Sequence, residues 1–260
     1  MIPRTIHYCW FGGNSLPIDA QNCIASWKKF FPDFEIKEWN EKNFDLSCCQ
    51  YVREAVQVRK WAYVSDFARM KILYENGGLY FDVDVEVIKD MSDIIERGAF
   101  LGIECNKKVT VNTGLGLAVE PGNAVIKEIL DSYYKDHFLD KKGKPIYITV
   151  VDRVTKILQK YGLENRNEMQ KVENFKIYPS DYFCPMDYNT GEIRLTDNTR
   201  TIHWYSASWF PEDYLRRRKV ALKLKRKFGK ILGTLIAYIY MKSTGAIGRI
   251  IKIGRTFIGH

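Results

Sequence analysis

The sequence predicts an α/β fold in which a central sheet is flanked by helices and ligands bind at the carboxyl ends of strands. Three observations predict it. Short apolar segments alternate with helical patterns along the first 210 residues. The first such segment, Ile6–Phe11, ends at Gly12-Gly13, as the first strand of a nucleotide-binding α/β domain often does. The third observation is a helical pattern that stops at Gly77-Gly78 and is followed by the apolar run Leu79–Val87, which contains Asp82-Val83-Asp84.

The periodicity of apolar residues predicts the individual elements. Residues 40–58 are expected to be helical in part. The expected helices are Pro17–Phe31, Lys60–Asn76, Ala124–Phe138 and Val150–Tyr161. The expected strands after Ile6–Phe11 are Phe34–Trp39, Leu79–Val87, Phe100–Ile103, Val111–Val119 and Phe175–Pro179. The run Thr201–Trp209 is expected to close the core.

The strand expected at Leu79–Val87 carries acidic residues on one face. Side chains alternate along a strand, so Asp82 and Asp84 share a face and lie about 6.5–7 Å apart at Cα. Two such carboxylates repel each other and are costly to desolvate unless a cation binds between them. Oxygen ligands suit Mg²⁺ or Mn²⁺, which often share their coordination with substrate phosphates. The pattern therefore predicts a metal–diphosphate site, and a solvated edge strand is the alternative.

Other residues have both a structural and a functional interpretation. Asp66 and Arg69 are three apart on a helix, so they form either a surface ion pair or a pair that contacts sugar hydroxyls. Trp10 is either a core residue or a platform for a nucleotide base. His203 is either a structural histidine or a third metal ligand, and imidazole suits Mn²⁺ better than Mg²⁺.

The composition is that of a globular chain with an asymmetric charge. The net charge is +9, from 40 basic and 31 acidic residues. From Arg216 onward there are 13 basic residues and no acidic ones, which leaves 27 basic against 31 acidic residues in the rest of the chain. The positive charge is thus a property of the tail. The six cysteines lack zinc-site spacing and are expected to be reduced thiols.

The tail shows a basic amphipathic pattern. Its apolar residues Leu224, Phe228, Ile231, Leu232, Leu235 and Ile239 follow helical spacing as one stripe. A second, weaker pattern runs from Ile247 to Phe257. The run Ile231–Met241 is too short to span a bilayer, so we expect residues 216–260 to lie on an anionic membrane surface. The alternative is a solvated helix that packs on the core. Nucleic-acid binding is not expected, because few aromatic residues interleave the basic run.

These motifs together resemble glycosyltransferase family 32, the group with a sugar-binding DxD motif that includes capsular-polysaccharide transferases. The sequence is also similar to the glucosyltransferase domain of large clostridial toxins. The resemblance covers residues 1 to about 210. It is carried by Ile6-His7 with Trp10 to Gly13, Ser65-Asp66-Phe67-Ala68-Arg69, Asn76-Gly77-Gly78-Leu79-Tyr80-Phe81-Asp82-Val83-Asp84, Asn112-Thr113-Gly114, and His203 with Ser208-Trp209.

The resemblance implies a GT-A fold, whose nucleotide-binding mixed sheet is flanked by helices. It also implies retaining transfer from a nucleotide-sugar. A UDP-sugar is the expected donor, and GDP-mannose is the alternative. Trp10 would stack on the base, and Tyr80 would lie beside the ribose or base. Asp66, Arg69 and Asn112 would contact the donor sugar.

The same resemblance implies a metal site for Mn²⁺ or Mg²⁺. Asp84 would bind the ion directly, and Asp82 partly through water while also contacting ribose or sugar. His203 or Ser208 would complete the metal shell, and Ser208 with Trp209 would approach the diphosphate. Asp66, Arg69, Asp82 and Asp84 are therefore the expected catalytic residues.

The expected organisation is a catalytic domain at 1–212 and a membrane-associating basic tail at 213–260. We expect a cytoplasmic enzyme, peripheral on the inner face of the plasma membrane. Its acceptor would be a glycan or a lipid-linked saccharide in surface or capsular polysaccharide synthesis. The alternatives are a non-enzymatic membrane adapter and an Asp-x-Asp phosphatase. In such a phosphatase the acidic strand stands near the chain start and a Gly-Thr/Ser-like loop follows it, whereas here Val85-Glu86 follows at mid-chain.

Overall fold

The computed structural model describes residues 1–105, 108–206 and 212–243. The chain divides into two compact units. The first unit comprises Met1–Pro185 and Leu195–Trp204. The second comprises Met186–Arg194 and the described chain from Tyr205 onward. The expected domain boundary between residues 212 and 213 stays a prediction.

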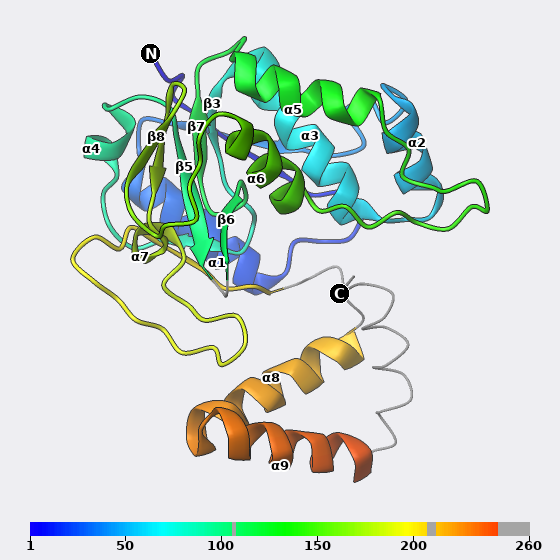
Figure 1. Ribbon diagram of the computed structural model, residues 1–260, viewed down its shortest axis with the longest axis vertical. Coiled ribbons are helices and arrows are strands. Elements are labelled where there is room, and N and C mark those ends of the chain that lie inside the picture. Colours follow the sequence, from blue (N-terminus) through cyan, green and yellow to red (C-terminus); the bar gives the residue numbers. More distant parts are fainter. Residues whose placement is uncertain (106–107, 207–211, 244–260) are drawn as a thin grey trace. The chain divides into compact units, whose positions relative to one another are not determined.

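The first unit is built on a mixed sheet (Figure 1). Its strands run in the order β2-β1-β3-β7-β5-β9-β8, with β6 paired to β5. These strands are β1 (Thr5–Cys9), β2 (Glu35–Trp39), β3 (Gly78–Tyr80), β5 (Phe100–Cys105), β6 (Val109–Asn112), β7 (Leu117–Val119), β8 (Gln170–Val172) and β9 (Phe175–Tyr178). A separate two-stranded sheet pairs β4 (Val85–Val87) with β10 (Thr201–His203).

The direction of the strands sets where a ligand can bind. Strand β1 is parallel to both β2 and β3, whereas β7 is antiparallel to β3. The carboxyl ends of β1, β2 and β3 therefore meet at one edge of the sheet. In α/β folds such an edge is the usual place for a ligand. The predicted fold class, α/β with a mixed sheet flanked by helices, is confirmed.

The helices α2, α3, α5 and α6 are grouped together beside the sheet (Figure 1), whereas α1 packs against β4. Side-chain caps define two of the starts, since Asn123 accepts the N–H groups of Val125 and Ile126, and Thr149 accepts that of Asp152. The helices of this unit are α1 (Ile18–Phe30), α2 (Gln50–Gln57), α3 (Trp61–Asn76), α4 (Ser92–Ile95), α5 (Ala124–Tyr134), α6 (Val150–Lys160) and α7 (Ser180–Phe183).

The sequence prediction misses both breaks inside expected elements and some short elements. The single strand expected at Val111–Val119 is two strands, β6 and β7, joined by a turn that contains Gly114 and Gly116. Gly116 has φ of +148°, which few side-chain-bearing residues adopt. The short elements α4, α7 and β8 were not predicted. Elements of three or four residues are too short to produce a recognisable period.

The second unit carries two helices, α8 (Glu212–Phe228) and α9 (Lys230–Ser243). Gly229, with φ of +76°, separates them. The prediction of one continuous apolar stripe from Leu224 to Ile239 is therefore wrong, because the chain turns back at this glycine. Among the described residues, no helix combines the length and apolar character needed to cross a bilayer. The weaker pattern at 247–257 lies outside the described residues.

Candidate active site

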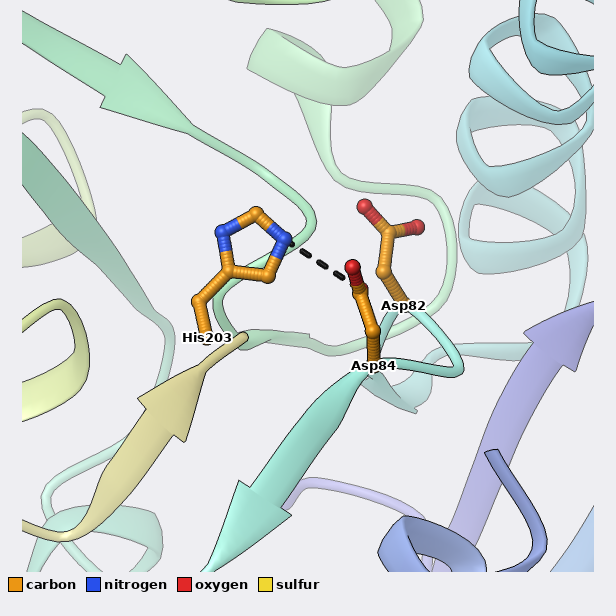
Figure 2. Close-up of side chains that lie close together, drawn as sticks. All are labelled: Asp82, Asp84 and His203. Atoms are coloured by element: carbon orange, nitrogen blue, oxygen red, sulfur yellow. Dashed lines mark ion pairs between the residues drawn. The ribbon is translucent and has the colours of Figure 1, made fainter. Parts of the chain in front are cut away.

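Asp82 and Asp84 lie on a turn between two sheets, and not on one strand as expected. Strand β3 ends at Tyr80 and β4 begins at Val85, and the N–H of Val85 donates to the Asp82 carbonyl across 3.0 Å. The strand breaks because β3 pairs within the large sheet while β4 pairs with β10. The turn follows the carboxyl end of β3, and Figure 2 shows its two carboxylates with His203.

His203 reaches the two carboxylates through strand pairing. Strand β10 is antiparallel to β4, with His203 opposite Val85. Its Nε2 lies 3.2 Å from Oδ1 of Asp84 (Figure 2). One ligand atom from each of Asp82, Asp84 and His203 lies within 4.8 Å of the other two. Two carboxylate oxygens and one imidazole nitrogen at this spacing fit a divalent cation such as Mn²⁺.

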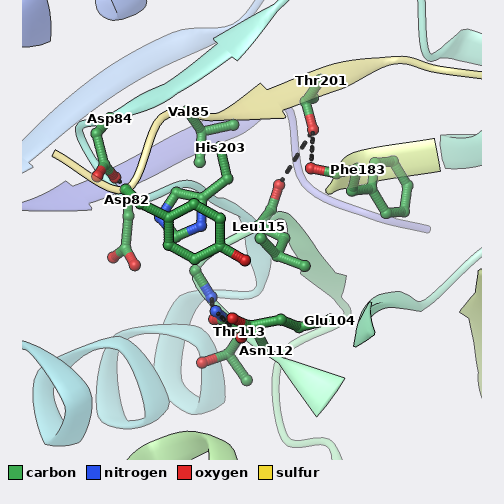
Figure 3. Close-up of polar contacts among 12 residues, drawn as sticks. Asp82, Asp84, Val85, Glu104, Asn112, Thr113, Leu115, Phe183, Thr201 and His203 are labelled. Atoms are coloured by element: carbon green, nitrogen blue, oxygen red, sulfur yellow. Dashed lines mark hydrogen bonds and ion pairs between the residues drawn. The ribbon is translucent and has the colours of Figure 1, made fainter. Parts of the chain in front are cut away.

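Thr201, the first residue of β10, connects this strand to the end of α7. Its hydroxyl donates to the carbonyl of Phe183 across 3.2 Å (Figure 3). Thr201 is fully buried, and His203 and Asp84 are each less than a tenth exposed. Burial alone would lower the pKa of His203, but the negative charge of Asp84 raises it above the ordinary value. The imidazole thus sits in a strongly negative environment, as a cation ligand would.

Arg69 is the buried cation of the site. Its Nη2 lies 2.9 Å from Oδ1 of Asp66 and 3.1 Å from Oδ1 of Asp82. Its Nη1 donates to the hydroxyl of Thr113 across 3.3 Å. Burial raises the pKa of Asp66 to about 6, although Arg69 opposes the shift. The interpretation of Asp66 and Arg69 as a surface ion pair is wrong, because both side chains are largely buried.

Tyr80 lies between the arginine and the acidic turn. Its ring packs 4.7 Å from the Arg69 guanidinium carbon, and its hydroxyl donates to Oδ1 of Asp82 across 3.2 Å. The side chain is almost fully buried. Tyr80 and Arg69 therefore fix the Asp82 carboxylate from two directions and leave Asp82 partly accessible.

Asn112 and Gly114 form a wall beside the acidic turn, and Figure 3 shows Asn112. The Asn112 amide donates to Oε2 of Glu104 across 2.8 Å and accepts the N–H of Gly114 at 2.8 Å. A Cβ on Gly114 would lie 1.8 Å from Oδ2 of Asp82, so a side chain here would displace that carboxylate. Sequence reasoning missed Glu104. Its signal was a lone carboxylate in the apolar strand Phe100–Cys105.

A pocket of about 500 Å³ opens beyond the ends of β1 and β2. It is lined by Gly12, Gly13, Glu41, Val56, Arg59 and Trp61. The N–H of Gly12 donates to the Glu41 carboxylate and so joins the two strand ends. Trp10, at the end of β1, is partly exposed and donates from Nε1 to the Asn14 carbonyl across 2.6 Å. Sequence reasoning placed Gly12 and Gly13 at this edge but missed Glu41, Arg59 and Trp61.

The structure thus gathers most of the predicted site residues. It brings Asp66, Arg69, Asp82, Asp84 and His203 into one cluster of direct contacts. Tyr80 joins the cluster through Asp82, and Asn112 lies on the wall beside it, where it accepts the N–H of Gly114. Ser208 and Trp209 lie outside the described residues. The roles assigned to all these residues stay predictions.

Comparison with known proteins identifies a shared sequence region. Residues 17–101 match the family described as "glycosyltransferase sugar-binding region containing DXD motif". The chain is 28% identical over 222 residues to an uncharacterized glycosyltransferase of Acanthamoeba polyphaga mimivirus, with 81% of this chain and 85% of that protein covered. These findings confirm the resemblance to glycosyltransferases with a DXD motif.

Solved glycosyltransferases show distant structural likeness. The PaToxG glycosyltransferase gives a TM-score of 0.46 at 18% identity, over 61% of this chain and 69% of that one. A glycosyltransferase involved in glycosylation of the major capsid of PBCV-1 gives 0.44 at 11%, over 82% and 100%. The galactosyltransferase LgtC, in complex with donor and acceptor sugar analogs, gives 0.42 at 14%, over 82% and 94%.

Proposed function

We propose that this protein, a glycosyltransferase with a DXD motif, transfers a sugar from a nucleoside-diphosphate donor with the help of a divalent cation. One observation carries the proposal. The cluster of Asp82, Asp84 and His203 follows β3, and the pocket follows β1 and β2, so both lie at the same edge of the parallel strands. If the nucleoside of the donor occupies the pocket, the diphosphate of the same donor would lie at the cluster.

The pocket has the chemistry for a nucleoside. The Trp61 side chain lines it, and Trp10 ends the adjacent strand. Aromatic rings stack on bases at about 1–3 kcal/mol per base. Glu41 and Arg59 add one acceptor and one donor group for the polar edges of a base or ribose. The sugar bound to the diphosphate would then meet Asp66, Arg69 and the Asn112 wall. A UDP-sugar is the proposed donor, and GDP-mannose is the alternative.

The cation would be held by Asp84, Asp82 and His203. When bound, it supplies positive charge to the diphosphate oxygen on which negative charge develops as the glycosidic bond breaks. The imidazole nitrogen in the ligand set favours Mn²⁺ over Mg²⁺. Arg69 holds Asp82 in place, and the backbone N–H of Trp204 donates to the Asp84 carbonyl across 2.9 Å. The protein thus fixes the ligand geometry before the donor arrives.

Transfer with retention needs no protein nucleophile in this arrangement. The three carboxylates of the acidic cluster are already engaged, since Asp66 and Asp82 contact Arg69 and Asp84 contacts His203. We therefore propose that the acceptor hydroxyl attacks from the face that the diphosphate leaves. The bond from the anomeric carbon to the phosphate oxygen breaks as the bond to the acceptor oxygen forms. The hydroxyl proton passes to the departing phosphate oxygen.

The family resemblance extends the proposal to the acceptor. We propose a glycan or lipid-linked saccharide, as in the synthesis of surface or capsular polysaccharides. A membrane-bound acceptor would be met by an enzyme at the inner face of the membrane.

Nucleotide release from a panel of UDP- and GDP-sugars tests the proposal. We expect slow hydrolysis of one donor with Mn²⁺, its loss in EDTA, and a drop of at least a hundredfold in Asp84→Asn. Asp33→Asn, which removes an exposed carboxylate elsewhere in the first unit, is the matched control and should keep full activity. If no donor is turned over or bound with any metal, the transferase proposal fails. A non-enzymatic adapter would then be the better interpretation.

A further inference from the structure

An aromatic cluster lies beside the start of α3. It consists of Tyr63 from α3 and of Phe138 and Tyr147 from the loop that joins α5 to α6. The ring centroid of Tyr63 lies 4.9 Å from that of Phe138 and 5.8 Å from that of Tyr147. Phe138 is fully buried, whereas Tyr63 and Tyr147 are partly exposed. Part of the surface of both tyrosines therefore faces solvent.

The first turn of α3 separates this aromatic cluster from the pocket proposed for the nucleoside. Trp61 lines the pocket, and Tyr63 belongs to the aromatic cluster. Residues two apart in a helix lie about 200° apart around its axis, so these two side chains leave α3 on opposite sides. Asp66, three residues after Tyr63, is only about 60° away from it. The aromatic cluster and the Asp66 carboxylate thus share one side of α3.

Helix α6 connects the aromatic cluster to the candidate active site. The loop that contains Tyr147 leads directly into α6, and the N–H of Val150, the first residue of that helix, hydrogen-bonds to the Asp66 carboxylate. Asp66 in turn contacts Arg69 at 2.9 Å. The three steps of chain from Tyr147 to Val150 span at most about 11 Å between Cα atoms. The aromatic cluster is therefore a neighbour of the group proposed to hold the donor sugar.

A buried carboxylate holds the aromatic loop in place. Glu54 of α2 accepts the N–H groups of Phe138 and Leu139 across 2.7 and 3.0 Å. Its Oε1 also lies 2.8 Å from Nδ1 of His137. Burial alone would raise the pKa of Glu54, but these hydrogen bonds and one from Gln50 lower it to about 2, so Glu54 is an anion at neutral pH. A loop fixed in this way keeps its side chains in position before a ligand arrives, which reduces the entropy lost on binding.

Two exposed isoleucines extend the apolar surface on either side of Tyr147. Ile146 is 37% exposed, and Ile148 is 43% exposed. Isolated exposed apolar residues are ordinary, but a set that adjoins a candidate active site marks a place where a ligand binds. Since the pocket and the acidic cluster are assigned to the donor, the ligand of this surface would be the second reactant.

We infer that the rings of Tyr63 and Tyr147 bind the acceptor as a saccharide, with one of its sugar rings stacked on them and its reactive hydroxyl directed toward the donor sugar at Asp66. The C–H groups on the face of a sugar ring are weakly positive and apolar, and the face of an aromatic ring is negative, so the two surfaces attract each other. This inference rests on the proposed sugar transfer, because it assigns the second substrate of that reaction. It puts the nucleoside and the acceptor on opposite sides of α3.

The size of the surface favours a saccharide over a protein acceptor. A specific protein–protein interface buries about 1,200–2,000 Å² and involves about 20–30 residues on each side. The surface described here is formed by four side chains, Tyr63, Ile146, Tyr147 and Ile148. That number suits one or two sugar rings.

The partition of the donor sugar between water and an acceptor tests the inference. The full chain is given Mn²⁺, the donor that it hydrolyses, and the methyl or octyl glycosides of glucose, galactose, mannose and N-acetylglucosamine. We expect at least one glycoside to raise nucleotide release and to receive the sugar, which mass spectrometry detects. If no nucleotide is released with or without a glycoside, the proposed function fails. Donor hydrolysis that no glycoside accelerates would leave the proposed function standing and overturn this inference alone.

Tyr147→Leu and Tyr147→Phe form a matched pair. Leu keeps an apolar side chain without an aromatic face, whereas Phe keeps the ring. The readout is the ratio of sugar transferred to the glycoside to sugar released to water at a subsaturating glycoside concentration, because a general loss of folded enzyme leaves this ratio unchanged. We expect the ratio to fall at least tenfold in Tyr147→Leu, through a higher acceptor KM, and to stay within about threefold in Tyr147→Phe. Tyr161→Leu, at an exposed tyrosine at the other end of α6, is the control and should keep the ratio.

Tyr63→Leu and Tyr63→Phe repeat the comparison on α3. Circular dichroism reports whether each variant is folded, and if the Leu variant of one tyrosine fails to fold, the pair at the other tyrosine decides. Equal ratios in the Leu and Phe variants would mean that the rings only pack, which would overturn the inference. Transfer to proteins of a cell extract, with none to any glycoside, would identify a protein acceptor and would overturn it as well.

Discussion

Arg69 neutralises two neighbouring carboxylates, Asp66 and Asp82. Its guanidinium contacts both Asp66 and Asp82 and packs on Tyr80. Breaking a buried ion pair from one side leaves an uncompensated charge, which costs about 3–5 kcal/mol. We therefore expect Arg69→Met to lower the free energy of unfolding by about that amount in urea titrations. The exposed pair of Arg166 and Glu164 gives a control, since Arg166→Met should cost less than about 1 kcal/mol.

His7 is a second buried residue, and it should make the stability of the protein depend on pH. Its Nε2 donates to the Gly77 carbonyl at 3.0 Å, and its Nδ1 accepts from Nε1 of Trp39 at 3.1 Å. Both contacts fit the neutral ring, and burial lowers its pKa from 6.5 to about 4. Between these values the unfolded chain binds the proton and the folded chain does not. Stability is then lost as the pH falls from 6.5 to 4, by about 3 kcal/mol in all.

The variant His7→Gln isolates this contribution. Its free energy of unfolding should depend less on pH between 6.5 and 4 than that of the natural chain, whatever its absolute stability. Urea unfolding at several pH values measures the two slopes. Parallel curves would mean that His7 does not set the dependence.

At this scale the sequence predicts pairs that lie close in the chain and misses those that do not. The three-residue spacing of Asp66 and Arg69 puts them on one helix face, and they do form a pair. The contact of Arg69 with Asp82 depends on how α3 sits against β3, which no local period encodes. Glu104 was missed for the same reason, because its partner Asn112 lies on another strand.

At the scale of elements, the acidic turn needs a glycine, Gly114, as its neighbour. The Gly114 carbonyl accepts the N–H of Asp82 at 3.0 Å, and its missing side chain leaves room for the Asp82 carboxylate. Ala at 114 must push that carboxylate away from its place. We expect Gly114→Ala to weaken Mn²⁺ binding at least tenfold by isothermal titration calorimetry. Gly98→Ala, at a glycine with nothing within 4 Å, should cost stability through its φ of +95° and leave Mn²⁺ binding unchanged.

The elements also show what periodicity can and cannot predict. Long helices such as α1, α3 and α6 lie within about one residue of their predicted limits, because many apolar positions define each one. The break between β3 and β4 escaped prediction. The run from Leu79 to Val87 is apolar at alternate positions throughout, so it reads as one strand. Only its partners, the large sheet for β3 and β10 for β4, show that the chain turns at the two aspartates.

At the scale of the whole molecule, the charge distribution predicts that the tail is a separate region, but it does not predict how the helices of the tail are arranged. The absence of acidic residues after Asp213 marks a separate region, and the described part of that region is helical. The hairpin of α8 and α9 was not predicted as such, although Gly229 stood in the expected stripe. A glycine weakens a helix without deciding between a kink and a reversal. Here the reversal is accompanied by the close contact of α9 with α8 at Gly233.

The candidate metal site joins distant parts of the chain, so cation binding should report on the folding of the first unit. His203 is 119 residues beyond Asp84 and meets it only when β10 pairs with β4. An unfolded chain has no such site, and a ligand that binds only the folded state stabilises it by about 2.7 kcal/mol at a hundred times its Kd. We expect Mn²⁺ to raise the Tm in proportion to the logarithm of its concentration. His203→Gln and Asp84→Asn should lose this rise, and Asp33→Asn should keep it. A rise in Tm that survives in both site variants would mean that the cation binds elsewhere. Asp82, Asp84 and His203 would then lie close together without being ligands of the cation.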